Sequence, residues 1–440
     1  MKMETTVTIE VKDFGPLHNV SFDIAPMTIF MGNSGLGKSY ANYLFYYLIS
    51  KFISSNGGLC DLLLPKVKEG KSEFDVKLEE IEIWLHDGVQ DYMRRFLGDS
   101  SLMCDVNFVF NRKCFDENYR ISYAIMNPEN SGKSDEKGQM NSFLKMPVDI
   151  NHNEYFGYIF PRIGMEESLS VAVRICGCWQ IELQHSLGCG YLSECILFPP
   201  GRGTFAGESY SMKSKIASSV GMYDEYLKGM ESAMYVYRKN EKPLYNDSIA
   251  KLIDGQLATE KDDQYLMLKD GRRLSLSAAA SSIKEVSPLI YALNNCGDMN
   301  YYLCIEEPEA HMHPQMQVNL MDLLAQCLNH GMWISFTSHS DYIMQRVNQL
   351  VKLGSIGKKN ENKCKALCET LSLRPDSCLD KEKIKVYYFH DDDGGVKVEL
   401  VPVSDRGFQM KTFFDIVEKM ENAEDVLNDA FDEIKTEQNA

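Results

Sequence analysis

The stretch Gly32-Asn33-Ser34-Gly35-Leu36-Gly37-Lys38-Ser39 has the spacing G-x-x-x-x-G-K-[ST]. Glycines at these positions let the backbone curl so that successive N–H groups point at one anion. Lys38 would place its charge beside the β- and γ-phosphate oxygens of a nucleotide, and Ser39 would offer a hydroxyl to Mg²⁺. The stretch therefore predicts a phosphate loop in which residues 32 to 39 bind ATP, with Ser39 as a magnesium ligand.

The residues on either side of this loop are those that a phosphate loop requires. Met27–Met31 reads as a short apolar strand, and Tyr40–Ile53 reads as a buried helix. A helix that begins near Lys38 would direct its positive end at the phosphates. The alternative is a Gly/Ser turn with a chance lysine, and the flanking strand and helix argue against it.

A second stretch, Tyr302–Ile305, is an apolar strand that ends in Glu306-Glu307. A carboxylate at the C-terminal end of a strand lies at the sheet edge where nucleotides bind. We expect Glu306 to hold Mg²⁺ through water and Glu307 to orient and activate the attacking water. A solvated acidic loop after a core strand is the alternative, and the phosphate loop upstream makes it less favoured.

Two weaker patterns complete the predicted site. Ser338-His339-Ser340 follows another apolar strand, so His339 could hydrogen-bond the γ-phosphate or the attacking water, although an ordinary loop histidine fits equally. Ser281 and Ser282 open a predicted helix, where small hydroxyl residues can bind an anion. Ordinary N-capping explains these two serines as well.

The elements along the chain predict an α/β fold. Tyr301–Ile305 and Trp333–Thr337 are apolar strands separated by a helix over Gln315–Asn329, and this βαβ rhythm implies a parallel sheet. We expect an N-terminal lobe over 1–56, an α+β insertion over 57–191, a C-terminal part over 192–410 and an acidic helical tail over 411–440. Further elements are expected as strand pairs at 7–24, 265–276 and 385–401, helices at 76–96, 164–187, 209–237 and 281–294, and a loop at 127–141.

Composition limits the class of protein. The chain has 440 residues, 44% of them apolar, and a net charge of −17, which disfavours non-specific DNA binding but leaves a local basic patch possible. The N-terminus lacks an apolar signal core, and the longest apolar run, Tyr40–Ile53, is too short and too interrupted to span a bilayer. We expect a cytoplasmic protein that does not cross the membrane.

Thirteen cysteines fit a reducing compartment better than a disulfide framework. Cys176, Cys178, Cys189 and Cys195 lack the paired C-x-x-C spacing of zinc sites. A second group, Cys364, Cys368 and Cys378, lacks an obvious fourth ligand. Both groups are expected to be buried thiols.

The order of these motifs resembles a known group. The chain carries the phosphate loop, a long insertion, a serine-led helix, the run Glu-Glu-Pro-Glu-Ala-His-Met-His-Pro over 306–314, and Ser338-His339-Ser340. This order resembles the ABC-type ATPases of the RecF, SMC and OLD (overcoming lysogenization defect) group, in particular stand-alone AAA_15/AAA_21-like ATPases of bacterial defence systems. Asp13-Phe14-Gly15-Pro16-Leu17 is similar to the start of that group, and Phe198-Pro199-Pro200-Gly201-Arg202 to its Pro-x-x-Arg element. Matching segments lie from about residue 7 to 410, and most of 57–191 is unmatched.

The resemblance implies an ABC-ATPase head with a mixed N-terminal sheet, a central parallel sheet that carries the phosphate loop, and a largely helical insertion. It implies that Lys38 and Ser39 belong to Walker A, Glu306 and Glu307 to Walker B, and 308–313 to the D-loop. Glu307 would be the catalytic base.

It further implies that His339 is the switch histidine. Ser281 and Ser282 would be the signature that reaches the γ-phosphate of an opposing subunit. Ile283 departs from the group, which usually has glycine there, so a side chain could crowd that phosphate. Gln180 and Gln184 are the available candidates for the Q-loop glutamine.

The biology that the resemblance implies is a slow, switch-like ATPase that uses ATP and Mg²⁺ and dimerises head to head. It would be the sensor subunit of an anti-phage defence system and control a separate effector, a Toprim- or HNH-type nuclease, because no nuclease module follows His339. The alternative is a RecF/SMC-like ATPase that binds nucleic acid in DNA repair or chromosome maintenance. A transporter subunit is disfavoured, because loop and signature lie nearly 250 residues apart.

Overall fold

A computed structural model describes residues 4–53, 58–126, 144–159, 166–205, 220–235, 244–260, 263–296, 299–392 and 394–438. The loop expected over 127–141 and the first part of the helix expected over 209–237 lie outside these residues. No helix in the described ranges combines the length and the apolar character needed to cross a membrane.

A six-stranded sheet with the order β16-β15-β3-β14-β13-β9 forms the centre of the molecule. All neighbouring strands pair in parallel except β15 and β16, which form an antiparallel hairpin. The predicted α/β class and the central parallel sheet are therefore confirmed. The strands are β3 (Met27–Gly32), β9 (Leu192–Phe198), β13 (Asn300–Ile305), β14 (Trp333–Ser338), β15 (Ile384–Asp392) and β16 (Gly395–Val401).

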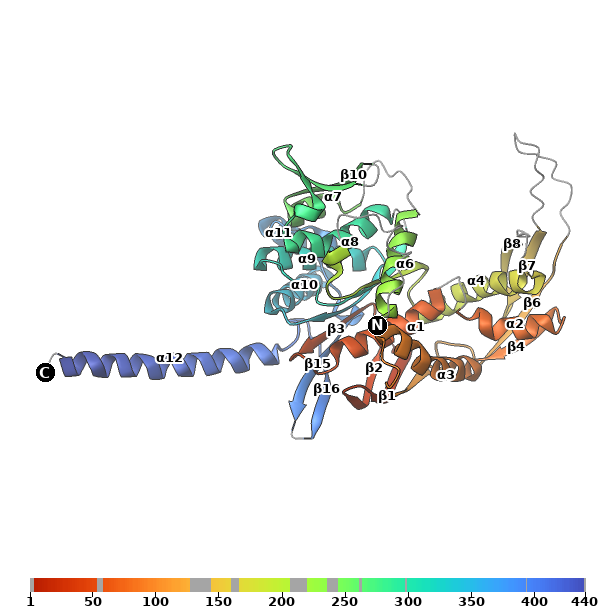
Figure 1. Cartoon of the computed structure of the whole chain (residues 1–440), viewed down its shortest axis with the longest axis horizontal. Helices are drawn as coiled ribbons and strands as arrows, with labels where there is room; N and C mark the ends of the chain where they lie inside the picture. The colour runs from red at the N-terminus through yellow and green to blue at the C-terminus, as the bar shows by residue number, and fades with distance from the viewer. Residues whose placement is uncertain are drawn as a thin grey trace.

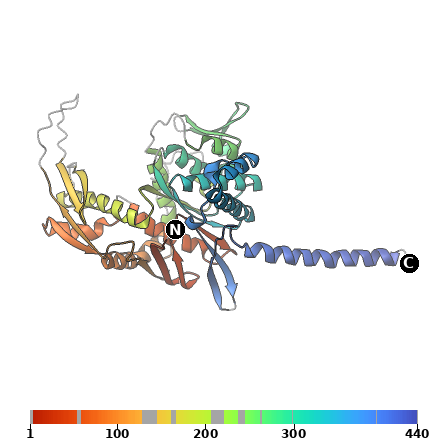
Figure 2. The same cartoon turned by 180° about the vertical axis from the view of Figure 1, so that it is seen from behind.

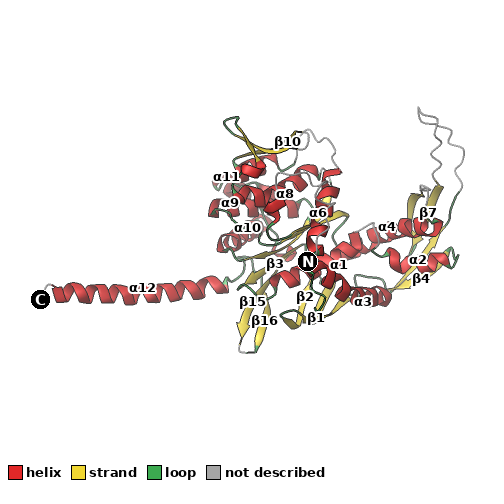
Figure 3. Ribbon diagram, viewed as in Figure 1, coloured by secondary structure: helices red, strands yellow, loops and turns green. Residues whose placement is uncertain are grey.

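The central strands are buried on both faces, which explains their continuous apolar sequences. Phe30, Tyr302 and Cys304 pack in a core on one face, together with α1 (Lys38–Ile53) and the N-terminal sheet. Their neighbours Ile29, Leu303 and others pack in a second core on the opposite face. Figures 1 and 3 show the C-terminal helices on this second side of the sheet.

The N-terminal sheet is smaller and has the order β2-β1-β5. Here β1 (Val7–Phe14), β2 (Leu17–Asp23) and β5 (Cys104–Phe110) pair antiparallel throughout, so the mixed pairing expected in this sheet occurs in the central sheet instead. Both neighbours of β1, the strands β2 and β5, run antiparallel to it. Because β5 comes from the predicted insertion 57–191, that segment contributes to the N-terminal sheet, and its boundaries as a domain stay a proposal.

The rest of the insertion forms an arm of both helices and strands (Figure 1). Its sheet has the order β4-β6-β7-β8, so strands accompany the expected helices. The elements of the arm are α2 (Cys60–Lys68), β4 (Glu73–Lys77), α3 (Leu78–Leu97), β6 (Asn118–Tyr123), β7 (Leu144–Ile150), β8 (Asn153–Ile159) and α4 (Glu167–Leu187).

The C-terminal half adds a three-stranded antiparallel sheet and a series of helices. They are α6 (Gly221–Tyr235), α7 (Asn246–Ile253), β10 (Gly255–Glu260), β11 (Asp263–Leu268), β12 (Arg273–Ser275), α8 (Ser281–Asn295), α9 (Pro314–Asn329), α10 (Asp341–Lys359), α11 (Glu361–Thr370) and α12 (Lys411–Gln438). The expected acidic tail is a single helix, α12, which projects away from the head (Figure 2).

Gly32, at the end of β3, offers a direct test of how the central sheet holds the phosphate loop. Its φ is +128°, and a Cβ there would lie 2.0 Å from the carbonyl oxygen of Phe389 in β15. Gly32→Ala should therefore lower the free energy of unfolding by about 2–4 kcal/mol, through backbone strain and overpacking. Chemical denaturation followed by circular dichroism measures this loss.

Gly35→Ala is the matched control, because Gly35 also has a positive φ, +79°, but open space around it. It should cost only the backbone strain, about 1–2 kcal/mol. Equal losses in the two variants would show that Gly32 is not packed against β15.

Candidate functional site

The loop between β3 and α1 has a backbone that glycine favours. Gly32, Gly35 and Gly37 have φ values of +128°, +79° and +90°. A Cβ on Gly37 would also lie 2.7 Å from Leu17. The N–H of Ala41 donates to Gly37 at 3.0 Å, so α1 continues directly from the loop and directs its positive N-terminal end toward it. The loop therefore has the curled, glycine-dependent backbone that the sequence predicts for a phosphate loop.

Lys38 folds back over this loop. Its Nζ donates to the carbonyl oxygens of Asn33 at 2.6 Å and Gly32 at 3.0 Å. Burial lowers the pKa of Lys38 to about 8, against the opposing effect of Glu307, Glu306 and Glu309. A phosphate bound beside the ammonium group would raise the pKa of Lys38 again and so favour its charged form.

The acidic strand end meets the loop at Glu306. The Ser39 hydroxyl donates to Glu306 Oε2 at 2.5 Å, although the two residues are 267 positions apart. Asn42 donates to the other carboxylate oxygen at 2.8 Å, and the Thr337 hydroxyl donates to Oε2 at 3.1 Å. Burial raises the pKa of Glu306, and these three hydrogen bonds oppose the rise.

The donor set at Ser39 and Glu306 fits Mg²⁺. A hydroxyl and a carboxylate are the hard oxygen ligands that this cation prefers, and Mg²⁺ keeps several waters beside them. Glu306 is buried, and its three hydrogen-bond donors are neutral groups. Because a buried carboxylate needs a compensating charge, a cation at this position would stabilise it.

Glu307 and His339 lie on the outer side of the same site. Glu307 has a φ of +42°, and its side chain is 51% exposed. His339 Nε2 lies 3.7 Å from Glu307 Oε1 and 3.5 Å from Ser34 Oγ. Burial and then Lys38 lower the pKa of His339, while Glu307 opposes this, so the imidazole is neutral at pH 7. The geometry brings His339, Glu307 and the phosphate loop together.

Two residues of this site, Asn42 and Thr337, were not predicted from the sequence, and Glu309 was predicted only as part of the D-loop. Asn42 and Thr337 bind Glu306, as described above. Glu309 Oε1 accepts from the His339 N–H at 2.7 Å and from the Ser338 hydroxyl at 2.9 Å, and burial raises the pKa of Glu309. The sequence held one indication: Glu309 belongs to the same acidic run as Glu306 and Glu307.

Arg202, from the Pro-x-x-Arg element, supports the acidic pair from behind. Its buried guanidinium donates to the carbonyl oxygens of Glu306 at 2.7 Å, Glu307 at 3.3 Å and Glu285 at 2.9 Å. It thereby fixes the end of β13 relative to α8. Its guanidinium also donates to the Pro199 carbonyl oxygen at 3.2 Å and lies 3.7 Å from the Glu285 carboxylate. Arg202 is a positioning residue, because it contacts Glu306 and Glu307 through their backbone carbonyl oxygens.

Ser281 and Ser282 begin α8. The N-cap of α8 is Ala280, so the two serines occupy its first turn and do not cap it. Ser281 lines a cavity of about 390 Å³ with Gly203, Thr204, Ser277, Lys284, Glu285 and His311. The cavity of about 170 Å³ at Gly32 and His339 shares none of these residues. Ile283 is buried in the core, so its side chain does not crowd this surface.

The two Q-loop candidates have structural contacts. Gln180 and Gln184 are both buried in α4. Gln184 accepts from the Leu192 N–H at 2.7 Å and donates to the Phe52 carbonyl at 3.5 Å, so it connects α4 with β9 and α1. This packing accounts for Gln184 without a nucleotide.

The lowered pKa of Lys38 leads to a pH prediction. Above pH 8 the free protein loses the Lys38 proton, whereas a bound triphosphate favours the charged form, so nucleotide binding must take up a proton. The affinity for ATP should therefore fall by up to about tenfold per pH unit above pH 8. Calorimetric titration in buffers of different ionisation enthalpy measures both the affinity and the proton uptake.

Lys38→Arg is the matched control, because a guanidinium stays charged throughout this range. The arginine variant should bind ATP without proton uptake above pH 8. Equal proton uptake by the two proteins would mean that another group titrates.

Comparison with known proteins places this site in a family. A family model described as an AAA ATPase domain matches residues 116–344. Among solved structures, an SMC head domain from Thermotoga maritima is 11% identical, with a TM-score of 0.32 over 90% of this chain and 98% of that one. An Smc head domain with an extended coiled coil, bound to the C-terminal domain of ScpA from Pyrococcus furiosus, is 11% identical, with a TM-score of 0.37 over 94% and 98%. No curated protein sequence matches the chain. The family model spans more than half of the 440 residues, and the chain therefore belongs to the AAA ATPase domain family.

Proposed function

We propose that this protein binds ATP and Mg²⁺ between two heads and hydrolyses the ATP slowly. The observation that carries the proposal is the 2.5 Å contact between Ser39 and Glu306. This contact supports a single cation held between the phosphate loop and the acidic strand end. Membership of the AAA ATPase domain family supports the same activity.

The proposed mechanism assigns a task to each side chain. The loop over 32–37 and Lys38 bind the β- and γ-phosphates, while Ser39 and Glu306 hold Mg²⁺, which neutralises phosphate charge. Glu307 accepts the proton of the attacking water as the bond between the γ-phosphate and the ADP oxygen breaks. His339 donates a hydrogen bond to the γ-phosphate, from its position beside Ser34 of the loop and Glu307. The half-exposed side chain of Glu307 can reach a water outside the loop.

The separation of the two cavities supports the dimer. Ser281 lines a different cavity from Gly32 and His339, so the serines of one head are free to face the nucleotide of another. Because Ile283 is buried, the first turn of α8 presents the small side chains of Ser281 and Ser282. Backbone N–H groups at a helix N-terminus suit a γ-phosphate from an opposing head.

Glu307→Gln tests this mechanism. The amide keeps the shape of the side chain but cannot accept the proton of water, so hydrolysis should slow by about 100-fold or more while ATP binding persists. The trapped ATP should also stabilise the dimer, which light scattering after gel filtration detects. Glu154→Gln, an exposed change in β8, should leave both properties unaltered. If the Glu307→Gln protein hydrolyses ATP at the wild-type rate, Glu307 is not the catalytic base.

We further propose that this ATPase is the sensor subunit of a bacterial anti-phage system and controls a separate nuclease of the Toprim or HNH type. The acidic helix α12 supports a protein partner, because Met420 is 68% and Phe431 66% exposed on it. Met410, which immediately precedes α12, lines the cavity at Gly32 and His339. A change at the nucleotide can therefore reach the base of α12.

Two assays separate this role from DNA repair. The purified wild-type chain should not cleave DNA. The Glu307→Gln variant should not bind DNA when ATP is added, because a chain with a net charge of −17 repels the phosphate backbone. A Toprim- or HNH-type nuclease should copurify with the full chain and be lost from a chain that ends at Met410, which should retain ATPase activity. ATP-dependent DNA binding with a steep salt dependence would instead support the RecF/SMC-like alternative.

A further inference from the structure

Three cysteines that are separated in the sequence converge beside α11. Cys364 and Cys368 belong to this helix, and Cys378 follows a short 3-10 helix, η3 (Pro375–Ser377). The Cys378 Sγ lies 3.7 Å from the Sγ of Cys364 and 3.7 Å from that of Cys368, and all three sulfurs lie within 4.8 Å of one another. Over the described ranges, this is the one group of three or more His, Cys, Asp or Glu side chains with metal-binding geometry.

The positions of the two helical cysteines follow from α11 itself. A spacing of four residues places Cys364 and Cys368 on one face of the helix, and both are buried. The helix is capped by Asn360, whose side chain accepts from the Lys363 N–H at 2.9 Å. The Leu373 N–H donates to the Cys368 carbonyl oxygen at 2.8 Å and closes the C-terminal end.

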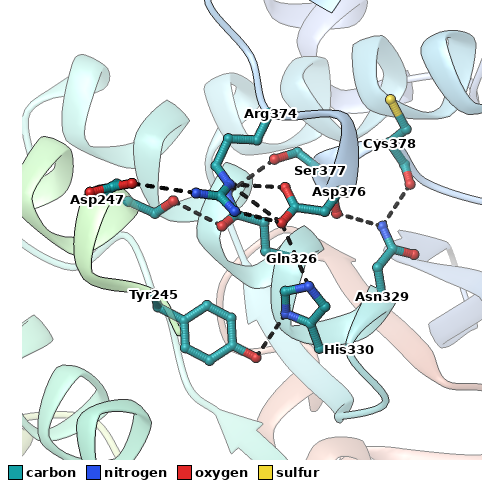
Figure 4. A network of polar contacts seen from close by, with 10 residues as sticks. Tyr245, Asp247, Gln326, Asn329, His330, Arg374, Asp376, Ser377 and Cys378 are labelled. Carbon is teal, nitrogen blue, oxygen red and sulfur yellow. Dashed lines mark hydrogen bonds and ion pairs between the residues drawn. The ribbon is translucent and has the colours of Figure 1, made fainter. Parts of the chain in front are cut away.

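Cys378 is held by a polar network that reaches it from α9. Asn329 Nδ2 donates to the carbonyl oxygens of Cys378 and Asp376, each at 2.7 Å. Gln326 Nε2 donates to Ser377 Oγ at 3.1 Å, and Arg374 pairs with Asp376 at 3.1 Å. Figure 4 shows this network, with the Cys378 sulfur directed away from it. The backbone around Cys378 is therefore fixed by contacts that do not involve the other two thiols.

We propose that Cys364, Cys368 and Cys378 bind one zinc ion as thiolates, with water at the fourth position. In a tetrahedral zinc site with Zn–S bonds of about 2.3 Å, the sulfurs lie about 3.8 Å apart. The two distances of 3.7 Å match this value, and they are far longer than the S–S bond of a disulfide, about 2.0 Å. Cys378 is the partly exposed member of the group, so solvent can supply the fourth ligand on its side.

The chemistry of the ligands selects the ion. Thiolates are soft ligands that favour zinc over magnesium, so this site would not compete for the Mg²⁺ at Ser39 and Glu306. Burial raises the pKa of Cys368 and Cys378. Binding of Zn²⁺ would form one Zn–S bond to each thiolate, and every proton that a thiol gives up would pass to solvent.

The proposed zinc ion would join α11 to the segment that leads into β15. In that segment the Leu379 N–H donates to Leu350 of α10 at 3.1 Å. A Cβ on Gly354 of α10 would lie 2.0 Å from the Leu379 carbonyl oxygen, so the backbones are in close contact. Because β15 pairs with β3, the ion would stabilise the side of the sheet that carries the phosphate loop. This role does not depend on the proposed function.

Metal analysis of the full chain tests the proposal. Protein that is expressed with added zinc and then desalted should contain about one zinc ion per chain, as measured by inductively coupled plasma mass spectrometry. Cobalt added after chelation should give the d–d bands of tetrahedral Co²⁺ and a sulfur-to-cobalt charge-transfer band. Cys378→Ser should lose both, whereas Cys114→Ser, a half-buried cysteine outside the group, should retain both.

The outcomes that would overturn the site are distinct from a failure to fold. Circular dichroism and ATP binding report whether Cys378→Ser is folded, and the cobalt spectrum of the wild-type chain requires no variant. Wild-type protein without zinc that also gives no thiolate–cobalt band would exclude the site. Zinc retained by folded Cys378→Ser would place the metal elsewhere. If a thiol assay of the isolated, denatured wild-type protein finds two fewer thiols than the sequence contains, two cysteines form a disulfide. That result would also contradict the proposal.

Discussion

The candidate site depends on one hydrogen bond between distant parts of the chain, the contact from Ser39 to Glu306. It exists because β14 lies between β3 and β13 and all three strands run in parallel. The C-terminal ends of parallel strands meet at one edge of the sheet, so the residues that follow them share that edge. The loop after β3, the acidic pair after β13 and His339 after β14 therefore meet in the order that the sheet imposes.

This arrangement places several charged groups in surroundings that water barely reaches. Lys38, Glu306 and Arg202 are all buried, and a buried charge is costly unless it is paired and hydrogen-bonded. Arg202 meets the need with backbone carbonyl oxygens and with the buried Glu285 carboxylate, 3.7 Å away, whereas Glu306 has neutral donors. Burial nevertheless lowers the pKa of Lys38 and raises that of Glu306, so both charged forms are disfavoured without a ligand. A ligand that brings both phosphate charge and a cation would supply it on both sides at once.

The sequence predicted the local patterns well. The phosphate loop, the strand before Glu306 and the helix over 315–329 are each encoded within a few consecutive residues, so spacing and hydrophobicity suffice to find them. The contacts of Asn42, Thr337 and Arg202 depend on which strands are neighbours, and spacing does not encode this. The same limit explains why β5 was assigned to the insertion alone, since its pairing with β1 is a long-range choice. The proximity of Cys378 to Cys364 and Cys368 has the same origin: the contacts of α9 with the segment after α11 hold Cys378 beside them, and the sequence shows only that a fourth ligand is missing.

The strand β15 connects the features that the sequence analysis treated separately. Its Phe389 lies opposite Gly32, where the backbones approach too closely for a side chain. The segment before β15 carries Cys378, and the segment after β16 leads through Met410 to α12. Three ligands would thus act on neighbouring parts of the β3, β15 and β16 side of the sheet. They are a metal at the cysteine group, a nucleotide at the phosphate loop and a partner on α12. Close-packed elements transmit small displacements. All three kinds of ligand would therefore affect the position of the β15–β16 hairpin relative to β3.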